Sequence, residues 1–386
     1  MSNNKFIKVT TVFCIALAVV AGFACTLRAT ASRPLEDEVR VRRIARLPQR
    51  NDWHNLQFIN QHEGWLANRK EVWRTGDGGK TWSLAFSGER SLHILDSISQ
   101  LEFINSQTGW MLVSPGFIYT TDNAGVVWTR LNTPDIVVRS IHVLKDGKRA
   151  WIAGEMYRPI SPRDAGVRSQ LVSTDGKKVL YPALFHTEDG GISWAYQPLP
   201  SSEGRLLHLF SLDPDHVWAS SDGEFFYFEG SSQKWKRVNY SKGTCPNRML
   251  LKTTQWDSHE GDAYAPVAIY FSDTNQGWLS FENGYLAKST DGGRSWCDLV
   301  DPRTVWSIPN WQTFFAKIHF TNSKDGWGLG GDGSLQETND GGATWRNLNM
   351  NVQFEDLFFL DNKNGWVVSN DSLFRIIPEM NTVSNR

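Results

Sequence analysis

The sequence contains little cysteine and almost no excess of charge. Two of its 4 cysteines, Cys14 and Cys25, lie in an apolar segment near the N-terminus, so Cys245 and Cys297 alone remain for the rest of the chain. The formal net charge is -1, which gives no reason to expect nucleic acid or an acidic membrane surface as a partner. The cysteines do not have the paired spacing of a metal site, so we expect no bound metal.

Recognisable catalytic motifs are also missing. The chain has no Gly-x-Ser-x-Gly, no His-Glu-x-x-His and no P-loop, which removes the signatures of common hydrolases, metalloproteases and nucleotide-binding proteins. We therefore expect a non-enzymatic protein that uses no cofactor.

Glycine and tryptophan, by contrast, are abundant, because the chain repeats one octet. The pattern Ser/Thr-x-Asp-x-Gly-x-Ser/Thr-Trp occurs without a mismatch at residues 75–82, 187–194, 289–296 and 338–345. A looser copy at residues 120–128 carries one extra residue before its Trp. The Asp carboxylate can accept N–H groups of the turn that follows, the Gly supplies a positive φ, and the Trp opens the next strand. Each octet therefore predicts a tight hairpin turn.

A second motif sets the number of repeats. In each copy an apolar strand is followed by a polar turn and by a strand that begins at a Trp. These residues are Trp65, Trp110, Trp151, Trp218, Trp278, Trp327 and Trp366. Repeats of about 40–50 residues with four short strands each are typical of a β-propeller. We predict an all-β fold of seven blades.

The seventh repeat is incomplete. After Trp366 the chain offers one more strand, at 373–377, and no octet. Residues 40–47 alternate charged and aliphatic side chains, as an exposed strand does. Because an open propeller would expose a long sheet edge, we expect this N-terminal strand to complete the seventh blade. The propeller then spans residues 40–378, and a polar tail follows at 379–386.

The first 31 residues have the features of an export signal. Lys5 and Lys8 precede an uncharged, mostly apolar run over residues 9–27, and Ala29-Thr30-Ala31 offers a cleavage site. The run is long for a signal peptide and nearly long enough to span a bilayer, so a cleaved signal and a retained anchor stay open. Residues 32–39 form a polar linker. In both cases we expect the propeller in the periplasm or at the outer face of the inner membrane.

Two long insertions interrupt the repeats, Gly154–Pro182 within the third blade and Asn239–Ala265 between the fourth and fifth. Strand parity places both on the face opposite the octets, which we call the insertion face. The fourth blade has lost its octet, because residues 228–235 keep the Trp but have Gly in place of the Asp. Cys245 and Cys297 either form a disulfide or remain two separate thiols.

The insertion face carries the candidate binding residues. They are four Trp residues in connections between blades and three Arg residues in the first insertion, namely Trp53, Trp256, Trp306, Trp311, Arg158, Arg163 and Arg168. These residue types are common in protein interfaces. The alternative is that the rings fill gaps between loops and the arginines are solvated. The octet carboxylates lie one per blade and never converge, so we interpret them as structural; they are Asp77, Asp122, Asp189, Asp291 and Asp340.

The octets are similar to the Asp-box, also called the bacterial neuraminidase repeat. Combined with the Phe…Gly-Trp strands, they make the chain resemble the photosystem II assembly/stability factor-like family over roughly residues 40–378. The resemblance implies an exported, non-enzymatic propeller that docks on a membrane-protein subunit, in the thylakoid lumen if the host is phototrophic. We expect a monomer with a protein partner.

Asp-boxes also occur in enzymes, so a glycan-binding or glycoside-hydrolysing propeller is the alternative. Arg46-Leu47-Pro48 resembles a motif near sialidase N-termini, but it lies on the strand needed for closure. A glycosidase needs two carboxylates across the bound sugar. Asp257, Glu260 and Asp262 are the one close acidic cluster on a long loop of the insertion face.

Overall fold

The computed structural model describes residues 40–48, 52–88, 96–160, 176–200, 206–221, 224–238, 266–281, 284, 286–300, 315–361 and 363–377. The chain divides into two compact units, residues 1–38 and 39–386, and the described residues belong to the second. Within them, no helix is long and apolar enough to cross a membrane. The apolar run 9–27, the linker and the polar tail lie outside the described residues, so the domain boundaries stay a prediction.

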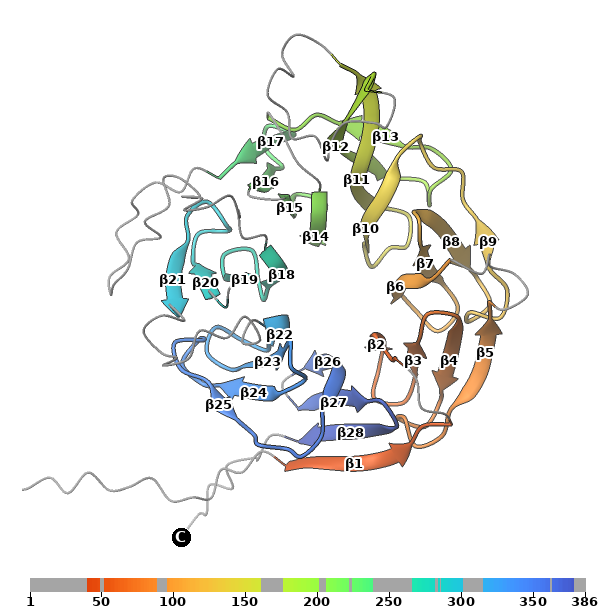
Figure 1. Ribbon diagram of the computed structural model, residues 1–386, viewed down its shortest axis with the longest axis vertical. Helices are drawn as coiled ribbons and strands as arrows, with labels where there is room; N and C mark the ends of the chain where they lie inside the picture. Colours follow the sequence, from red (N-terminus) through yellow and green to blue (C-terminus); the bar gives the residue numbers. More distant parts are fainter. Residues whose placement is uncertain are drawn as a thin grey trace, which may run out of the picture. The chain divides into compact units, whose positions relative to one another are not determined.

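Seven four-stranded antiparallel sheets are arranged as the blades of a propeller, which confirms the predicted fold (Figure 1). The first blade consists of β2 (Asn55–Phe58), β3 (Gly64–Ala67), β4 (Glu71–Thr75) and β5 (Ser83–Ser87). The second consists of β6 (Ile98–Phe103), β7 (Gly109–Val113), β8 (Phe117–Thr121) and β9 (Thr129–Arg130). The third consists of β10 (Val137–Val143), β11 (Ala150–Pro159), β12 (Lys178–Thr187) and β13 (Ala195–Gln197).

The remaining blades follow in chain order. The fourth consists of β14 (Leu206–Asp213), β15 (His216–Ser221), β16 (Phe225–Glu229) and β17 (Lys234–Arg237). The fifth consists of β18 (Pro266–Phe271), β19 (Gly277–Phe281), β20 (Leu286–Ser289) and β21 (Cys297–Val300). The sixth consists of β22 (Phe315–Phe320), β23 (Gly326–Gly330), β24 (Leu335–Thr338) and β25 (Arg346–Asn347). The seventh consists of β26 (Phe354–Asp361), β27 (Asn364–Ser369), β28 (Ser372–Ile377) and β1 (Arg40–Arg46).

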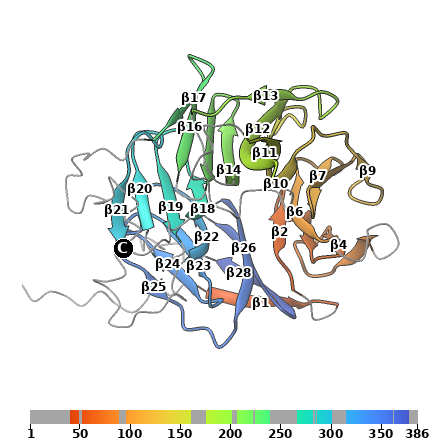
Figure 2. The ribbon, with the colours of Figure 1, turned by 45° about the horizontal axis from the view of Figure 1, so that its top comes forward.

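The composition of each strand follows from its place in the blade. Figure 2 shows the first strands innermost and the fourth strands outside. The second strands are buried on both faces, as in β7, whose sequence Gly-Trp-Met-Leu-Val is almost wholly apolar. The fourth strands lie at the rim, and β9 is reduced to two exposed residues. Short, polar outer strands limit edge-to-edge pairing between molecules.

The N-terminal strand closes the propeller, as predicted. β1 pairs antiparallel with β28, from Arg40 opposite Ile377 to Arg46 opposite Ser372, with an irregularity between Arg43 and Ala45. Figure 1 shows β1 as the outermost strand of the seventh blade. Ala45 belongs to the same buried cluster as Leu373 of β28. The two ends of the domain are therefore held in one sheet.

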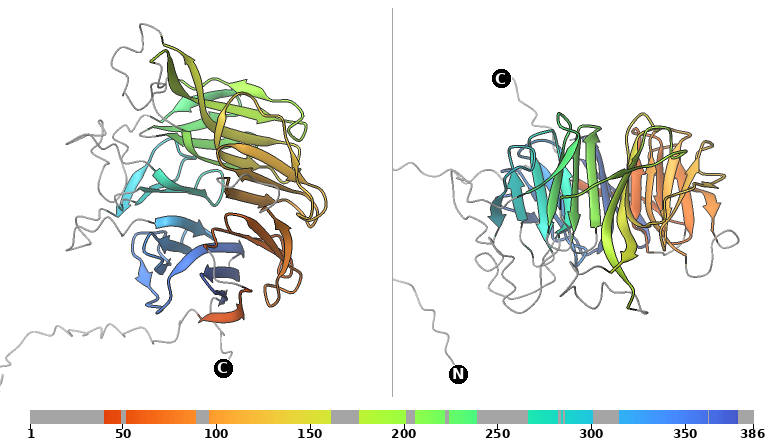
Figure 3. Two further views of the ribbon diagram at one scale, coloured as in Figure 1. Left: turned by 45° about the vertical axis from the view of Figure 1, so that its right-hand side comes forward. Right: turned by 90° about the horizontal axis from the view of Figure 1, so that it is seen from above.

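The first insertion begins as an extension of the third blade rather than as a loop. β11 and β12 stay paired beyond Gly154, from Glu155 opposite Pro182 to Pro159 opposite Lys178. This projecting pair, which we call the blade-3 hairpin, extends beyond its sheet in both views of Figure 3. The connection predicted as a long loop from Gly154 to Pro182 is therefore strand at both of its ends. The second insertion lies outside the described residues.

Candidate functional site

Each strict octet joins the third and fourth strands of its blade, and its carboxylate is consumed within the turn. In residues 289–296, Oδ1 of Asp291 accepts hydrogen bonds from the Ser289 hydroxyl and the Ser295 amide, both at 2.8 Å. Oδ2 accepts one from the Ser295 hydroxyl at 2.6 Å. The other three strict octets repeat this pattern. The carboxylates hold turns and lie one per blade, as a structural role requires.

The same bonds keep these carboxylates ionised. Hydrogen bonds from the side chain and amide of Ser193 lower the pKa of Asp189 to about 2. Burial raises the pKa of Asp77, but bonds from Thr81 and Thr75 outweigh it and bring that pKa to about 2 as well. A carboxylate that already accepts several bonds and is this weak a base is a poor general acid or base near neutral pH.

The looser octet has a different register from the predicted one. Asn123, not Asp122, takes the position of the acid, since its Oδ1 accepts the Val127 amide at 2.9 Å and the Thr121 hydroxyl at 2.9 Å. The copy is therefore residues 121–128, of normal length, with Asn for Asp and Val for the second hydroxyl residue. Asp122 is exposed. The assignment of Asp122 as an octet carboxylate was wrong, because the neutral amide oxygen satisfies the same turn.

Removing one octet carboxylate is expected to lower stability. Asp291→Ala leaves turn amides and hydroxyls without an acceptor and should reduce the free energy of unfolding by about 1–3 kcal/mol, measured by urea denaturation. Asp291→Asn should cost less, because Asn123 serves a turn of this kind. Asp122→Ala is the matched control and should be close to neutral. A large loss for Asp122→Ala would contradict the register given above.

The octets also connect neighbouring blades. Inside its own blade the fourth octet residue donates its N–H to the turn between the first two strands, as Gly292 does to the Asn275 carbonyl at 2.9 Å. Its carbonyl then accepts the indole N–H of the Trp in the preceding blade, as from Trp218 at 2.9 Å. That Trp stacks on Phe271 of the next blade with ring centroids 3.6 Å apart. An octet and the Trp of the preceding blade thus form one junction between neighbouring blades.

A junction of this kind also connects the seventh blade to the first, across the closure. Trp366 of the seventh blade donates to the Gly78 carbonyl of the first octet at 3.3 Å and stacks on Phe58 at 3.8 Å. Four of the seven strand tryptophans, Trp65, Trp218, Trp278 and Trp366, thus connect their blade to the octet of the next blade through the indole N–H.

Blade 4 departs from this arrangement. Residues 228–235 have the length of an octet, but Phe228 pairs with Trp235 and Glu229 with Lys234. β16 and β17 therefore stay paired up to their turn, and we call this pair the upright hairpin because it does not fold over as an octet does. No octet folds over the turn between β14 and β15. The Trp235 indole N–H is buried without a hydrogen-bond partner, whereas the octet Trp296 donates to Gly293 at 3.0 Å.

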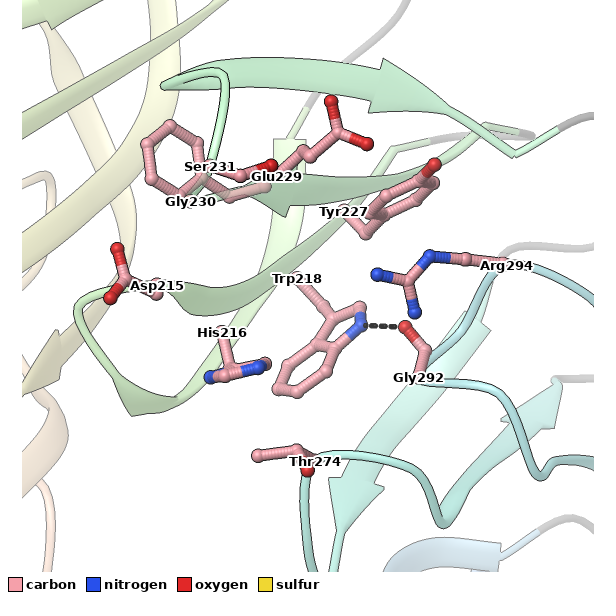
Figure 4. A pocket seen from close by; sticks show the side chains of 11 residues that line it. Asp215, His216, Trp218, Tyr227, Glu229, Gly230, Ser231, Thr274, Gly292 and Arg294 are labelled. Carbon is pink, nitrogen blue, oxygen red and sulfur yellow. Dashed lines mark hydrogen bonds between the residues drawn. The ribbon is translucent and has the colours of Figure 1, made fainter.

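A cavity of about 350 Å³ lies at this place, between blades 4 and 5 (Figure 4). One wall is the β14–β15 turn with Asp215 and His216, and a second is the upright hairpin with Gly230 and Ser231. The third wall belongs to the octet of blade 5, where Arg294 lies over the Tyr227 ring at 5.4 Å. We call this space the blade-4 pocket. The missing octet in the sequence was the signal for it.

Around the axis, side chains of several first strands connect neighbouring blades. Gln57 donates to the Phe103 carbonyl at 2.9 Å, and Tyr270 donates to the Phe320 carbonyl at 2.8 Å. Rings follow one another on one side of the axis, with centroids 4.7–5.7 Å apart; they belong to His142, Phe210, Tyr270 and His319. Burial raises the pKa of Tyr270. These groups serve packing between blades and were not singled out in the sequence.

The structure places two of the predicted binding residues. Trp53 is 1% exposed, and its indole donates to the Asn370 carbonyl at 3.1 Å, so it fills the joint between the first and seventh blades. The expectation of an exposed ring does not hold for Trp53. Arg158 lies on the blade-3 hairpin with its guanidinium 5.5 Å from the Tyr181 ring. The others lie outside the described residues; they are Arg163, Arg168, Trp256, Trp306 and Trp311.

The remaining candidate residues do not come together as a catalytic or metal site within the described part of the chain. Cys297 lies in β21 and is disulfide-bonded, but Cys245 lies outside the described residues, so their pairing stays a prediction. Arg46 is in the outermost strand of its blade, and the acidic cluster Asp257, Glu260 and Asp262 is not described. In the part of the chain with assigned structure, no group of three or more His, Cys, Asp or Glu could hold a metal.

Three comparisons with known proteins agree with one another. A family model described as the photosynthesis system II assembly factor YCF48 matches residues 36–137. The photosystem II assembly lipoprotein Ycf48 of Synechococcus sp. (strain CC9902) is 25% identical over 274 residues, which are 63% of this chain and 73% of that protein.

Two solved structures share the fold. The structure of YCF48 bound to a D1 peptide has a TM-score of 0.58 at 19% identity, covering 88% of this chain and 97% of that chain. YCF48 from Cyanidioschyzon merolae has a TM-score of 0.60 at 19% identity, covering 88% and 99%. The chain is a seven-bladed Asp-box β-propeller that resembles the YCF48 family of photosystem II assembly factors.

Proposed function

We propose that the protein is an exported, non-enzymatic binding factor that docks on a membrane-protein subunit during assembly. The match to the YCF48 family carries this proposal. One solved relative is bound to a D1 peptide, and the curated relative is a lipoprotein. We extend both features to this chain, so that residues 9–27 direct export and then either tether the propeller or are cleaved from it. We expect the mature protein to be a monomer in the periplasm, or in the thylakoid lumen of a phototroph.

The blade-3 hairpin supports a binding role for the insertion face. Tyr157 and Ile160 are 51% and 41% exposed, which are high values for large apolar side chains. Tyr157 lies in the blade-3 hairpin opposite Leu180, and Ile160 directly follows β11. Arg158, beside them, lies over an aromatic ring. Aromatic and arginine side chains supply most of the energy at the centres of protein interfaces. We therefore assign the first contact with the partner to this hairpin, together with Arg163, Arg168, Trp256, Trp306 and Trp311 of the same face.

The test is capture of the partner from solubilised membranes by the immobilised protein. Tyr157→Ala with Ile160→Ala should lower the captured amount at least about tenfold, because buried interface anchors contribute roughly 2 kcal/mol or more. Tyr196→Ala is the matched control, since Tyr196 is 47% exposed but lies on β13 at the rim. Equal capture by the double variant would move the interface elsewhere. Cleavage of sialosides or β-glucans by the wild type would contradict the proposal itself.

A further inference from the structure

In five blades the octet lies against the turn between the first two strands of the same blade. In each of them the fourth octet residue donates its backbone N–H, at 2.8–2.9 Å, to a carbonyl of the turn between the first two strands. The acceptors occupy equivalent positions and are His62, Gln107, Lys148, Asn275 and Lys324. Each acceptor lies two residues after an Asn or Asp whose Oδ1 accepts its N–H. The position is therefore a constant of the repeat.

In blade 4 the equivalent residue is Asp215, two residues after Asp213. In the described part of the chain, neither its carbonyl nor its carboxylate has a hydrogen-bond partner. The upright β16–β17 hairpin comes close to Asp215 at Gly230 but provides no N–H donor. The blade-4 pocket is therefore the place of the missing octet, with the acceptor still present.

The other charged groups of the pocket each contact a neighbour in its walls, although the exposed Arg294 guanidinium uses only part of its five N–H groups in this way. Arg294 donates to the Asp291 carbonyl at 2.7 Å, and Glu229 accepts the Ser232 hydroxyl at 2.6 Å and lies 3.5 Å from the Lys236 ammonium. His216 is 2.8 Å from Asp213. Among these charged groups Asp215 alone makes no such contact with the described residues, and its acceptors are open to solvent at the pocket wall. The pocket consequently suits a ligand that donates hydrogen bonds to Asp215 and accepts them from Arg294, as a polypeptide backbone does.

We propose that the blade-4 pocket binds a turn of a partner polypeptide, whose backbone N–H groups replace those of the missing octet at Asp215. This inference rests on the proposed function, because it names a second contact of the same kind of partner. A polypeptide turn satisfies the geometry because that is what occupies the corresponding space in five of the six other blades. The contact lies on the octet face, so it is separate from the blade-3 hairpin.

The probe is the acetylated, amidated peptide Ser-Thr-Asp-Gly-Gly-Arg-Ser-Trp, which has the sequence of the chain's own octet 289–296. Titrated into the isotope-labelled full chain to about 10 mM, it should shift the Trp218 indole N–H signal in a saturable way. Ser231→Trp, which places a ring in the pocket mouth, should abolish that shift. Lys80→Trp is the matched control on the octet of blade 1 and should leave the shift unchanged. A peptide of the same composition in scrambled order should not shift the signal.

A second variant tests the idea from inside the chain. Replacing residues 228–235 by the octet sequence 289–296 keeps the length and should close the pocket, so that the peptide no longer binds. The inference is overturned if the wild type shows no saturable shift, if Ser231→Trp still responds, or if sialyllactose shifts the signal and the peptide does not. Partner capture that depends on Tyr157 and Ile160 while the peptide fails would remove this inference and leave the proposed function intact.

Discussion

A chain that begins at Asp52 is expected to melt about 5–10 °C below a chain that begins at Val39. The shorter chain lacks β1, so β28 loses its outer partner along its whole length. It also loses Ala45 and Leu47 from the buried cluster around Trp366 and Leu373. Together the lost ladder and apolar burial amount to several kcal/mol, on the order of 5.

The measurement is thermal unfolding followed by near-ultraviolet circular dichroism, which reports the many buried indoles. The Val39 chain is the control, because it removes residues 1–38 and keeps β1. Coincident melting curves for the two chains would show that β1 is dispensable for closure. A loss of melting temperature confined to the Asp52 chain is the expected result.

The protein is expected to lose stability as the pH falls from 6.5 towards 4, because of two histidines near the axis. Burial lowers the pKa of His208 to about 4. Burial, aided by the charge of Lys317, lowers the pKa of His319 to about 3. Below pH 6.5 the unfolded chain binds protons at both residues and the folded chain does not, so stability falls with pH. Between pH 6.5 and 5 each histidine contributes a loss of about 2 kcal/mol.

Urea unfolding of the wild type and of the His208→Gln, His319→Gln double variant at pH 7 and pH 5 measures this effect. The double variant should show a clearly smaller loss between the two values. His142→Gln is the opposing control. Burial lowers the pKa of His142, but Glu102 outweighs burial and the net shift is upward, so protonated His142 stabilises the folded protein at low pH. An unchanged pH slope in the double variant would contradict the assignment. The octet carboxylates act in a separate window, between about pH 3.8 and 2.

Repetition made most of the fold readable from the sequence. Four strict octets and seven strands that begin at a Trp indicate a propeller of seven blades. The seventh blade lacks an outer strand after Trp366, which indicated residues 40–47 as its fourth strand. The register of the loose octet was misread because the count was made from an acid, whereas the turn requires only an oxygen acceptor at Asn123. Trp53 was misread because its position in a connection says nothing about which neighbour covers it.

The candidate sites were less predictable than the fold. The extent of the blade-3 hairpin depends on pairing between Glu155 and Pro182, which no local pattern indicates. The loss of the octet in blade 4 was visible, but its consequence was not, because a pocket depends on what neighbouring segments leave unfilled. The conserved length of residues 228–235 would have suggested an octet-like turn, yet Phe and Lys at its hydroxyl positions turn it into strand.

The pairing of β1 with β28 also imposes an order of events during biogenesis. Of the strands in the described residues, β1 is synthesised first and β28 last, so residues 47–371 must be synthesised before the two can meet. Contacts so distant in sequence form late, after the intervening blades have organised. Until then the first strand and the seventh blade each present an open edge of the kind that chaperones and proteases recognise. A chain truncated anywhere before residue 372 keeps that edge permanently, so the closure distinguishes finished molecules from incomplete ones.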